Sequence, residues 1–241
     1  MNNFTKHTIL LAATSLCAIN AANAVEKGKF YAAGSYGVGF ADRFDYNDAV
    51  LDVKKPSNAN VFGLAVGYGV TDNIRAELSY NGFYDMKYKF KKFLDTEDEN
   101  GEDTKTHVDL KEKNTIHAMF ASAYYDVNHF GQIKPYVGAG VGVAHVQSKE
   151  NNLQEFYKAQ EGKQALTKTG EGTFEGSASK TQFAWQVGAG VNYALSNKVE
   201  LNLVNYRYTD LGKSVVMEGS IHDNPTKIRV HSISAGLTYK F

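Results

Sequence analysis

Four charged residues stand out because the strand faces on which they fall are otherwise built from small or polar residues. Arg75 and Glu77 belong to one alternating segment, and Glu200 and Arg207 belong to another. If these segments close into a narrow barrel, the small faces point inward, where side chains just fill the space. Buried charges must then pair, because an unpaired one carries a large desolvation cost. We expect a lumen charge cluster of Arg75, Glu77, Glu200 and Arg207 that plugs the interior; a charged constriction for ions is the alternative.

Two further patterns suggest chemistry but have the wrong residues at the required positions. The acidic run 95–103 is similar to a calcium loop, but alignment on Gly101 puts Thr96 first and His107 twelfth, where Asp and Glu are required. The glycine run 138–142 has a period of two and lacks the Lys-Ser/Thr pair of a phosphate-binding loop. We therefore predict neither a metal site nor a cofactor, and we interpret 95–103 as a solvated loop tip.

The histidines offer no catalytic pattern along the chain. His231 and Ser232 are adjacent, so in a strand they lie on opposite faces and cannot couple. The other histidines are scattered without metal-ligand spacing. We predict no catalytic residues and no enzyme, although groups that meet only in space stay open.

The elements that must position these residues are strands, because apolar residues recur with a period of two. The C-terminal segment is the clearest: Ile233, Ala235, Leu237, Tyr239 and Phe241 share one face. The facing of the fourth strand is ambiguous. The predicted strands are 29–40, 60–70, a third from 74 to about 84, 115–127, 135–146, 182–195, 198–208 and a last one that ends at Phe241.

The connections between these strands alternate between short and long. Turns follow the second, fourth and sixth strands, whereas 41–59, 91–114, 148–180 and 210–227 are predicted as long loops. Loops of this length are uncommon in a compact soluble domain. Within 148–177, Leu153, Phe156, Tyr157 and Gln160 have the spacing of a short amphipathic helical turn.

The N-terminus has the composition of a secretory signal. Lys6 and His7 precede an apolar run over 9–19, and Ala22-Asn-Ala24 offers a small-x-small cleavage site. We therefore expect a signal peptide at 1–24, cleaved after Ala24, and one domain at 25–241. The single cysteine lies inside the signal, which leaves no thiol chemistry. With 26 basic and 26 acidic residues, the chain has no net field to attract nucleic acid.

The whole mature chain resembles the eight-stranded outer-membrane barrels, the OmpA-like and opacity-type surface proteins and similar α-proteobacterial surface antigens. The residues that carry the resemblance are the Ala22-Asn-Ala24 site, the Val-Gly-x-Gly-Val runs at 66–70, 137–141 and 187–191, and Tyr239-x-Phe241. It implies an all-β, eight-stranded antiparallel up-and-down transmembrane β-barrel in the bacterial outer membrane, with Tyr239 and Phe241 as an assembly signal. The implied partners are outer-membrane lipid and lipopolysaccharide, the barrel-assembly machinery and a host-cell surface.

A soluble lipocalin-like barrel is the structural alternative. It would place the bulky residues inside, whereas faces of Gly, Ala and Ser opposite Phe, Trp, Tyr and Val fit a narrow interior and a lipid exterior. We therefore expect a structural, adhesin-like surface protein whose long extracellular loops contact a host or the environment. A narrow porin for small solutes is the second interpretation, and a lipid-modifying outer-membrane enzyme is the third.

Overall fold

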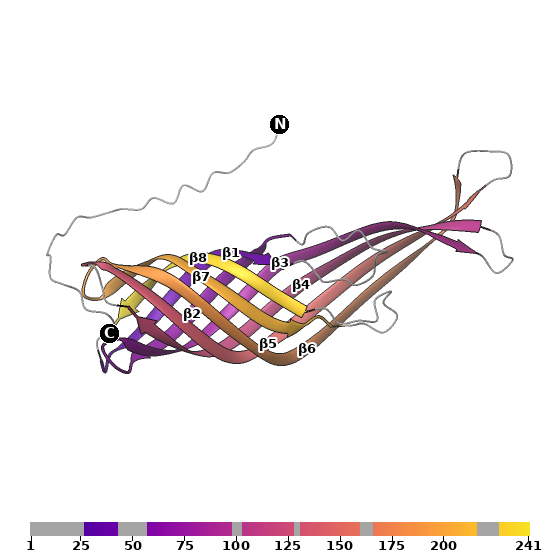
Figure 1. Cartoon of the computed structure of the whole chain (residues 1–241). Coiled ribbons are helices and arrows are strands. Elements are labelled where there is room, and N and C mark those ends of the chain that lie inside the picture. The colour runs from indigo at the N-terminus through magenta and orange to yellow at the C-terminus, as the bar shows by residue number, and fades with distance from the viewer. Residues whose placement is uncertain (1–26, 43–56, 98–102, 128–130, 160–165, 216–226) are drawn as a thin grey trace, which may run out of the picture.

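Eight antiparallel strands form a closed barrel in the computed structural model, which describes residues 27–42, 57–97, 103–127, 131–159, 166–215 and 227–241. Each strand pairs with the next along the chain, and β1 pairs with β8 to close the ring (Figure 1). The predicted signal peptide at 1–24 lies outside the described residues. The strands are β1 (Phe30–Ala41), β2 (Ala59–Gly69), β3 (Ile74–Glu97), β4 (Asp103–Asp126), β5 (Ile133–Ala159), β6 (Leu166–Ala194), β7 (Val199–Lys213) and β8 (Lys227–Lys240).

The two ends of the barrel differ. At the turn end, residues 70–73 and 195–198 connect strands closely, with the amide of Val70 donating to the carbonyl of Ile74 (2.9 Å). At the opposite end β3, β4, β5 and β6 continue beyond the ring as a four-stranded sheet, which we call the extended end (Figure 1). At about 3.3 Å per residue, the part of β3 beyond the ring spans roughly 30 Å.

The extended end corrects two sequence expectations. Most of 91–114 and 148–180 is strand rather than loop, because long hairpins keep their ladder hydrogen bonds outside the barrel. The helical turn predicted around Leu153 and Tyr157 is wrong, since both residues belong to β5; Gln160 lies outside the described residues. No helix long and apolar enough to cross a membrane occurs in the described part of the chain.

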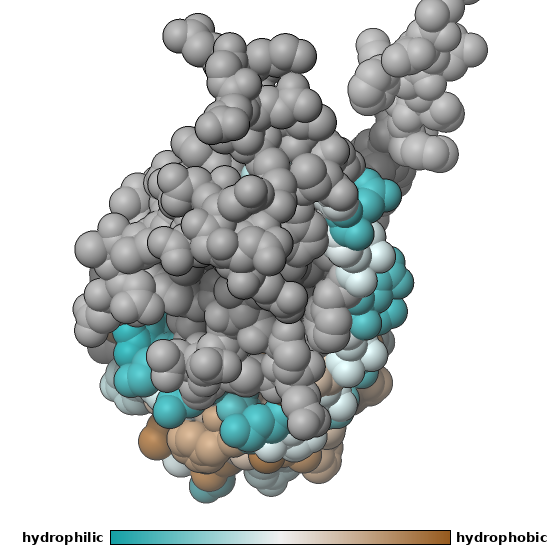
Figure 2. Space-filling view, turned by 90° about the vertical axis from the view of Figure 1, so that its right-hand side faces the viewer, coloured by the Kyte–Doolittle hydropathy of each residue, from teal (hydrophilic) through white to brown (hydrophobic). Residues whose placement is uncertain are grey.

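The bulky apolar side chains lie on the outer wall. Leu78, Met119 and Phe183 each expose more than 60% of their surface, whereas the residues that alternate with them face inward. In a view onto the extended end, hydrophobic residues appear on the outer wall and hydrophilic residues beside them (Figure 2). This arrangement is the opposite of a lipocalin interior. The facing of β4 is also settled, because Phe120 and Tyr124 are buried in the lumen while Met119 and Tyr125 point outward.

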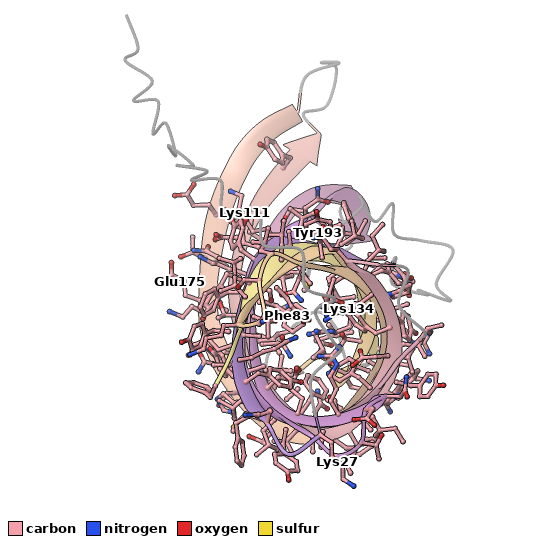
Figure 3. The ribbon with its side chains drawn as sticks, turned by 90° about the vertical axis from the view of Figure 1, so that its left-hand side faces the viewer. Lys27, Phe83, Lys111, Lys134, Glu175 and Tyr193 are labelled. Atoms are coloured by element: carbon pink, nitrogen blue, oxygen red, sulfur yellow. The ribbon has the colours of Figure 1, made fainter. Side chains whose placement is uncertain are left out.

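The lumen has an apolar half and a polar half. The expected interior of small residues is wrong for the half next to the extended end, where large side chains such as Phe83, Ile116 and Leu211 pack into a dry core. Figure 3 shows Phe83 and Lys134 inside the ring of strands. The apolar half consists of Ala59, Val61, Phe83, Met86, Ile116, Ala118, Phe120, Ala144, Val146, Ala184, Leu211, Ile228 and Val230.

Two bulges decide which side chains reach the lumen. In β7 the pairing with β8 shifts between Asn202 and Asn205, so that Leu203 and Val204 both face outward. An extra residue in one strand reverses the alternation beyond it. In β3 the pairing with β4 shifts between Phe83 and Met86, where Asp85 has a φ of 63°. Aspartate tolerates this left-handed conformation better than most residues.

Candidate functional site

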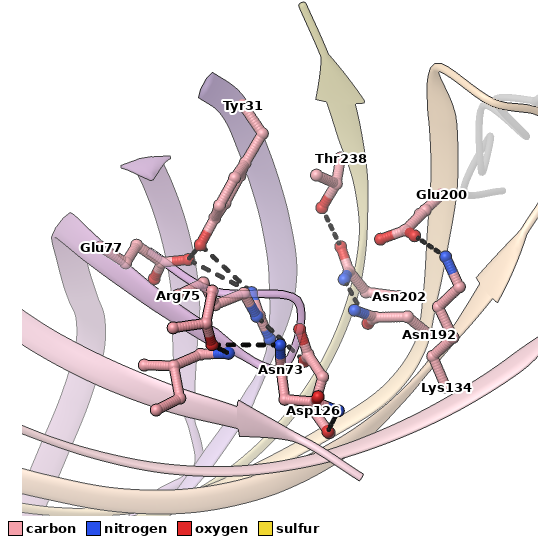
Figure 4. A network of polar contacts seen from close by, with 12 residues as sticks. Tyr31, Asn73, Arg75, Glu77, Asp126, Lys134, Asn192, Glu200, Asn202 and Thr238 are labelled. Atoms are coloured by element: carbon pink, nitrogen blue, oxygen red, sulfur yellow. Dashed lines mark hydrogen bonds and ion pairs between the residues drawn. The ribbon is translucent and has the colours of Figure 1, made fainter. Parts of the chain in front are cut away.

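The polar half of the lumen is centred on Arg75. This residue is 6% exposed, and its Nε donates to Asp126 Oδ1 at 3.1 Å, while its Nη1 lies 3.8 Å from Glu77 Oε2. Nη1 also donates to Tyr31 Oη at 3.2 Å, and that hydroxyl donates to Glu77 Oε2 at 2.9 Å (Figure 4). The guanidinium is therefore held between two carboxylates, which compensates its burial.

Three aromatic rings complete the surroundings of this guanidinium. The Cζ atom of Arg75 lies 4.5 Å from the ring centre of Tyr124, 4.7 Å from that of Tyr136 and 5.7 Å from that of Tyr31. Tyr124 and Tyr136 also contact each other edge to face, with 5.7 Å between ring centres. Cation–π attraction strengthens when water is excluded, so the rings hold Arg75 in place as well as filling the lumen.

The repeated glycine runs make room for these rings. A Cβ on Gly67 would lie 2.0 Å from Cζ of Tyr31, and a Cβ on Gly138 would lie 2.2 Å from Cδ1 of Tyr124. Real Cβ atoms do not approach so closely, so a side chain at either position would displace a ring. The interpretation of the Val-Gly-x-Gly-Val runs as glycines facing a crowded lumen is confirmed.

Glu200 forms a second charged group. Its Oε1 lies 2.6 Å from Nζ of Lys134 (Figure 4). It also lies 2.6 Å from Nζ of Lys240, and all three side chains are buried. One carboxylate between two ammonium groups leaves a net positive charge here, whereas Arg75 between two carboxylates leaves a net negative charge. The two groups therefore offset each other within one lumen.

Arg207 stands apart from both groups. Its Nη1 donates to Asn81 Oδ1 at 2.9 Å, and no acidic side chain pairs with it among the described residues. It lines a cavity of about 40 Å³ together with Arg75, Glu77, Ser79 and Asn81. Ser79 Oγ and Asn81 Nδ2 are buried there without a protein partner in the described structure.

The structure thus places Arg75, Glu77 and Glu200 inside the lumen and Arg207 on the wall of its cavity, but not as one cluster. The expected pairing of Arg75 and Glu77 with charges on the seventh strand does not occur. Their partners are Asp126 and Tyr31, which sequence reasoning missed.

Some of the missed lumen residues could have been predicted from the sequence, and others could not. Lys134 has the same parity as the inward glycines of β5, so extending the predicted strand by one residue would have found it. Lys240 lies on the predicted small face of β8. Asp126 had no such signal, because the facing of its strand was ambiguous.

Histidines occur on the outer wall in contact with tyrosines. His231 Nδ1 lies 2.7 Å from Tyr206 Oη, and His231 Nε2 lies 3.2 Å from Asp42 Oδ1. His117 Nδ1 lies 2.6 Å from Tyr80 Oη in the same manner.

Ser232 is buried in the lumen, whereas His231 lies on the outer wall, so the prediction that the two cannot couple is confirmed. The histidine–tyrosine contacts satisfy the hydrogen bonding of phenol and imidazole groups on the outer wall. No cluster of three or more metal-ligating side chains is found in the described residues.

Lysines gather on the outer face of the extended end. Lys113 lies between Lys87 and Lys149 across three strands, and Lys111 lies two residues before Lys113 on β4. Like charges directly opposite one another are unfavourable in a sheet. Asp85 relieves part of this repulsion: its Oδ1 lies 3.1 Å from Nζ of Lys113, which lowers the pKa of the Asp85 carboxyl.

The aromatic residues at the end of β8 lie on the outer wall at the turn end. Tyr239 and Phe241 are 46% and 66% exposed, and their rings meet edge to face at 5.4 Å. The Phe241 amide donates to the Phe30 carbonyl at 3.0 Å, which attaches the last residue to β1.

Several known proteins are similar to this chain. Outer membrane protein PagN of Salmonella typhimurium is 29% identical over 143 residues, which is 56% of this chain and 54% of PagN, so the match spans about half of that relative. RC1281 of Rickettsia conorii, named as a candidate adhesin, is 27% identical over 207 residues, covering 81% of this chain and 73% of that protein.

Solved structures of outer-membrane barrels also align with it. Neisserial surface protein A is 21% identical with a TM-score of 0.48, covering 88% of this chain and 97% of that one. The attachment invasion locus protein Ail of Yersinia pestis is 14% identical with a TM-score of 0.46, covering 89% and 99%.

A family model also matches this chain. The model described as the outer membrane protein beta-barrel domain matches residues 9–241, which is nearly the whole chain. The closed barrel with its apolar outer wall is the architecture that this family name describes. The chain therefore belongs to the outer membrane protein β-barrel domain family and is an outer-membrane barrel related to adhesin-like proteins.

Proposed function

We propose that this protein is a closed, surface-exposed outer-membrane barrel whose extended end binds a host cell or another external surface. The observation that carries the proposal is the contrast between the two parts of the molecule. Four strands continue beyond the ring, while the ring itself is filled. A rigid barrel that presents a large projecting sheet is suited to contact rather than to transport or chemistry.

The filled lumen argues against the porin alternative. The apolar half is packed with side chains, and the polar half holds all its charges except Arg207 in two groups that offset each other, beside a cavity of about 40 Å³. An ion that crossed this lumen would have to displace both the apolar core and the paired charges. No relative cited above is named as an enzyme, and the described lumen offers no nucleophile held by a base.

The orientation follows from the lengths of the connections. Outer-membrane barrels have short periplasmic turns and longer extracellular loops. We therefore assign the turn end to the periplasm and the extended end to the outside. The row of Lys87, Lys113 and Lys149 then lies just above the apolar wall, where the anionic groups of lipopolysaccharide would offset the repulsion between these lysines.

Export and assembly belong to the same proposal. A signal peptide cleaved after Ala24 would deliver the chain to the periplasm. Tyr239 and Phe241, exposed at the periplasmic rim, would then be the signal for the barrel-assembly machinery. The adhesin designation of the Rickettsia conorii relative supports host contact as the function.

The proposal is tested by removing the projecting sheet without touching the barrel. Lys87 and Lys113 are register partners, as are Lys149 and Ser177, so each hairpin can be closed there with an Asn-Gly turn. Bacteria displaying this shortened variant should lose binding to host cells, while the purified variant keeps the heat-resistant mobility of a folded barrel on gels. Binding that survives the removal would contradict the proposal.

A further inference from the structure

Among the residues that the structure describes, the polar half of the lumen contains one positive charge more than its acids compensate. Its cations are Arg75, Lys134, Arg207 and Lys240, and its acids are Glu77, Asp126 and Glu200. The three acids and three of the cations, Arg75, Lys134 and Lys240, make up the two groups described above. Arg207 is the remaining cation, and the only hydrogen-bond acceptor of its guanidinium among the described side chains is an amide oxygen.

The orientation of Asn81 is fixed by this contact. A guanidinium can only donate hydrogen bonds, so the oxygen of Asn81 must face Arg207. The amide nitrogen Nδ2 is then committed to the other side, where it finds no protein acceptor. Asn81 is 2% exposed, so this donor is isolated from bulk solvent. A buried donor without an acceptor costs free energy, which indicates that something else occupies the space beside it.

A second unsatisfied group lies in the same place. Ser79 is two residues before Asn81 on β3, and in a strand both side chains project from one face. Ser79 Oγ has no protein partner in the described structure, although the residue is only 7% exposed. Both residues and Arg207 line the cavity of about 40 Å³. A cavity of this size holds about three water molecules, so it has room for a small ion with a water molecule.

We propose that this cavity binds a small monovalent anion of the halide class, chloride being the abundant example. The ion would accept hydrogen bonds from the Arg207 guanidinium, from Asn81 Nδ2 and from the Ser79 hydroxyl. It would supply the negative charge that the lumen side chains lack. Glu77 also lines the cavity, but its Oε2 accepts from Tyr31 and faces Arg75, so its charge is directed into the Arg75 group.

The size of the cavity predicts selectivity among anions. Chloride and bromide are little larger than water and fit the space, whereas gluconate is far larger than the cavity. An anion that binds the folded barrel and not the unfolded chain stabilises the fold, and the stabilisation grows by a constant increment for each tenfold rise in concentration above its Kd. Sodium gluconate at matched ionic strength therefore separates binding from general screening by salt.

The experiment compares thermal unfolding of the detergent-folded barrel in sodium chloride and in sodium gluconate. The wild type should have a higher midpoint in chloride, and the difference should disappear in Arg207→Gln. The decisive variant is Asn81→Asp, because its carboxylate would take the place of the ion beside Arg207. It should unfold at the same temperature in both salts, at or above the wild-type midpoint in chloride.

Arg229→Gln is the matched control. Arg229 is an arginine on the outer face of β8, paired with Asp210 at 3.5 Å, and its removal changes the net charge by the same amount. It should keep the chloride response. Equal unfolding of the wild type in the two salts, or a chloride response that persists in both Arg207→Gln and Asn81→Asp, would overturn the proposal and assign the cavity to water alone.

A crystal soaked in bromide gives a direct second test. An anomalous difference peak beside Arg207 and Asn81 in the wild type, and its loss in Asn81→Asp, would support the site. The absence of a peak in the wild-type cavity would contradict it.

Discussion

At the scale of single residues, the lumen is governed by the cost of buried charge. Arg75 has two carboxylates within 4 Å, and Glu200 has two ammonium groups at 2.6 Å. Such groups contribute little net stability compared with apolar residues of the same volume, but removing one member leaves the others uncompensated. The effect of a substitution therefore depends on whether the whole group or one member is changed.

The substitution Arg75→Ala removes the cation that Glu77 and Asp126 share. We expect a loss of about 3–5 kcal/mol in the free energy of unfolding, because two carboxylates are left buried together. Urea unfolding of the purified barrel in detergent measures this. Lys198→Ala, at an exposed turn position, is the control and should change the free energy by less than about 0.5 kcal/mol. A loss of that small size for Arg75→Ala would refute the role of the ion pairs.

At the scale of elements, the bulge in β7 determines which residues reach the lumen. Glu200 and Arg207 are seven positions apart, so strict alternation would place them on opposite faces. Because Leu203 and Val204 both face outward, the parity changes between the two charged residues and both reach the interior. Without this bulge, one of them would meet lipid.

Deletion of Val204 tests the bulge. Asn202 and Asn205 are three positions apart, whereas their partners on β8 are two positions apart, so Val204 is the extra residue. Deleting it leaves Leu203 alone opposite the residue between those partners, and both flanking segments keep their faces. We expect the deleted variant to keep a heat-resistant folded band after dilution into detergent, as Val204→Ala should. Loss of that band in the deleted variant while Val204→Ala still folds would contradict this register.

A comparison of Phe241 with Phe30 can separate a role in barrel assembly from simple affinity for lipid. Phe241 and Phe30 are both exposed on the outer wall at the turn end, and their backbones are hydrogen-bonded. Phe241→Lys should sharply reduce membrane-inserted protein in cells, whereas Phe30→Lys should reduce it less, since only the terminal aromatic is proposed to be recognised. The folded band in isolated outer membranes reports both. Equal losses would indicate that lipid contact alone accounts for the effect.

At the scale of the whole molecule, a closed barrel carries an open sheet. The apolar half of the lumen closes the ring next to the point where β3–β6 leave it. This core gives the projecting hairpins a rigid base, because interiors packed at high density deform little. Substitutions in the projecting hairpins can therefore change their contact with an external surface without affecting the stability of the barrel.

Planar-bilayer recording tests the closed state. The wild-type barrel should give no steady single-channel conductance, because the apolar core and the compensated charges leave no continuous aqueous path. The variant with shortened hairpins should behave in the same way. Robust channels in the wild type that change in Arg75→Ala and not in the shortened variant would favour the porin interpretation.

The sequence alone determined the barrel and its two faces. A strand has a period of two, so the alternation of bulky and small residues predicts eight strands and orients all of them except the fourth with their apolar side outward, and the closed barrel is confirmed. It also identified Arg75, Glu77 and Glu200 as interior charges, because their parity matches that of the small residues.

Only the tertiary structure decided which charges meet, where the lumen is dry and how far the strands continue. Partners such as Asp126 and Lys134 come from other strands, and their distance depends on the stagger around the closed ring. The face of β7 on which Arg207 lies depends on a bulge that leaves no local signature. The polar segments beyond the barrel are strands because each hairpin pairs with the next, and pairing between strands is a long-range property that local composition does not encode.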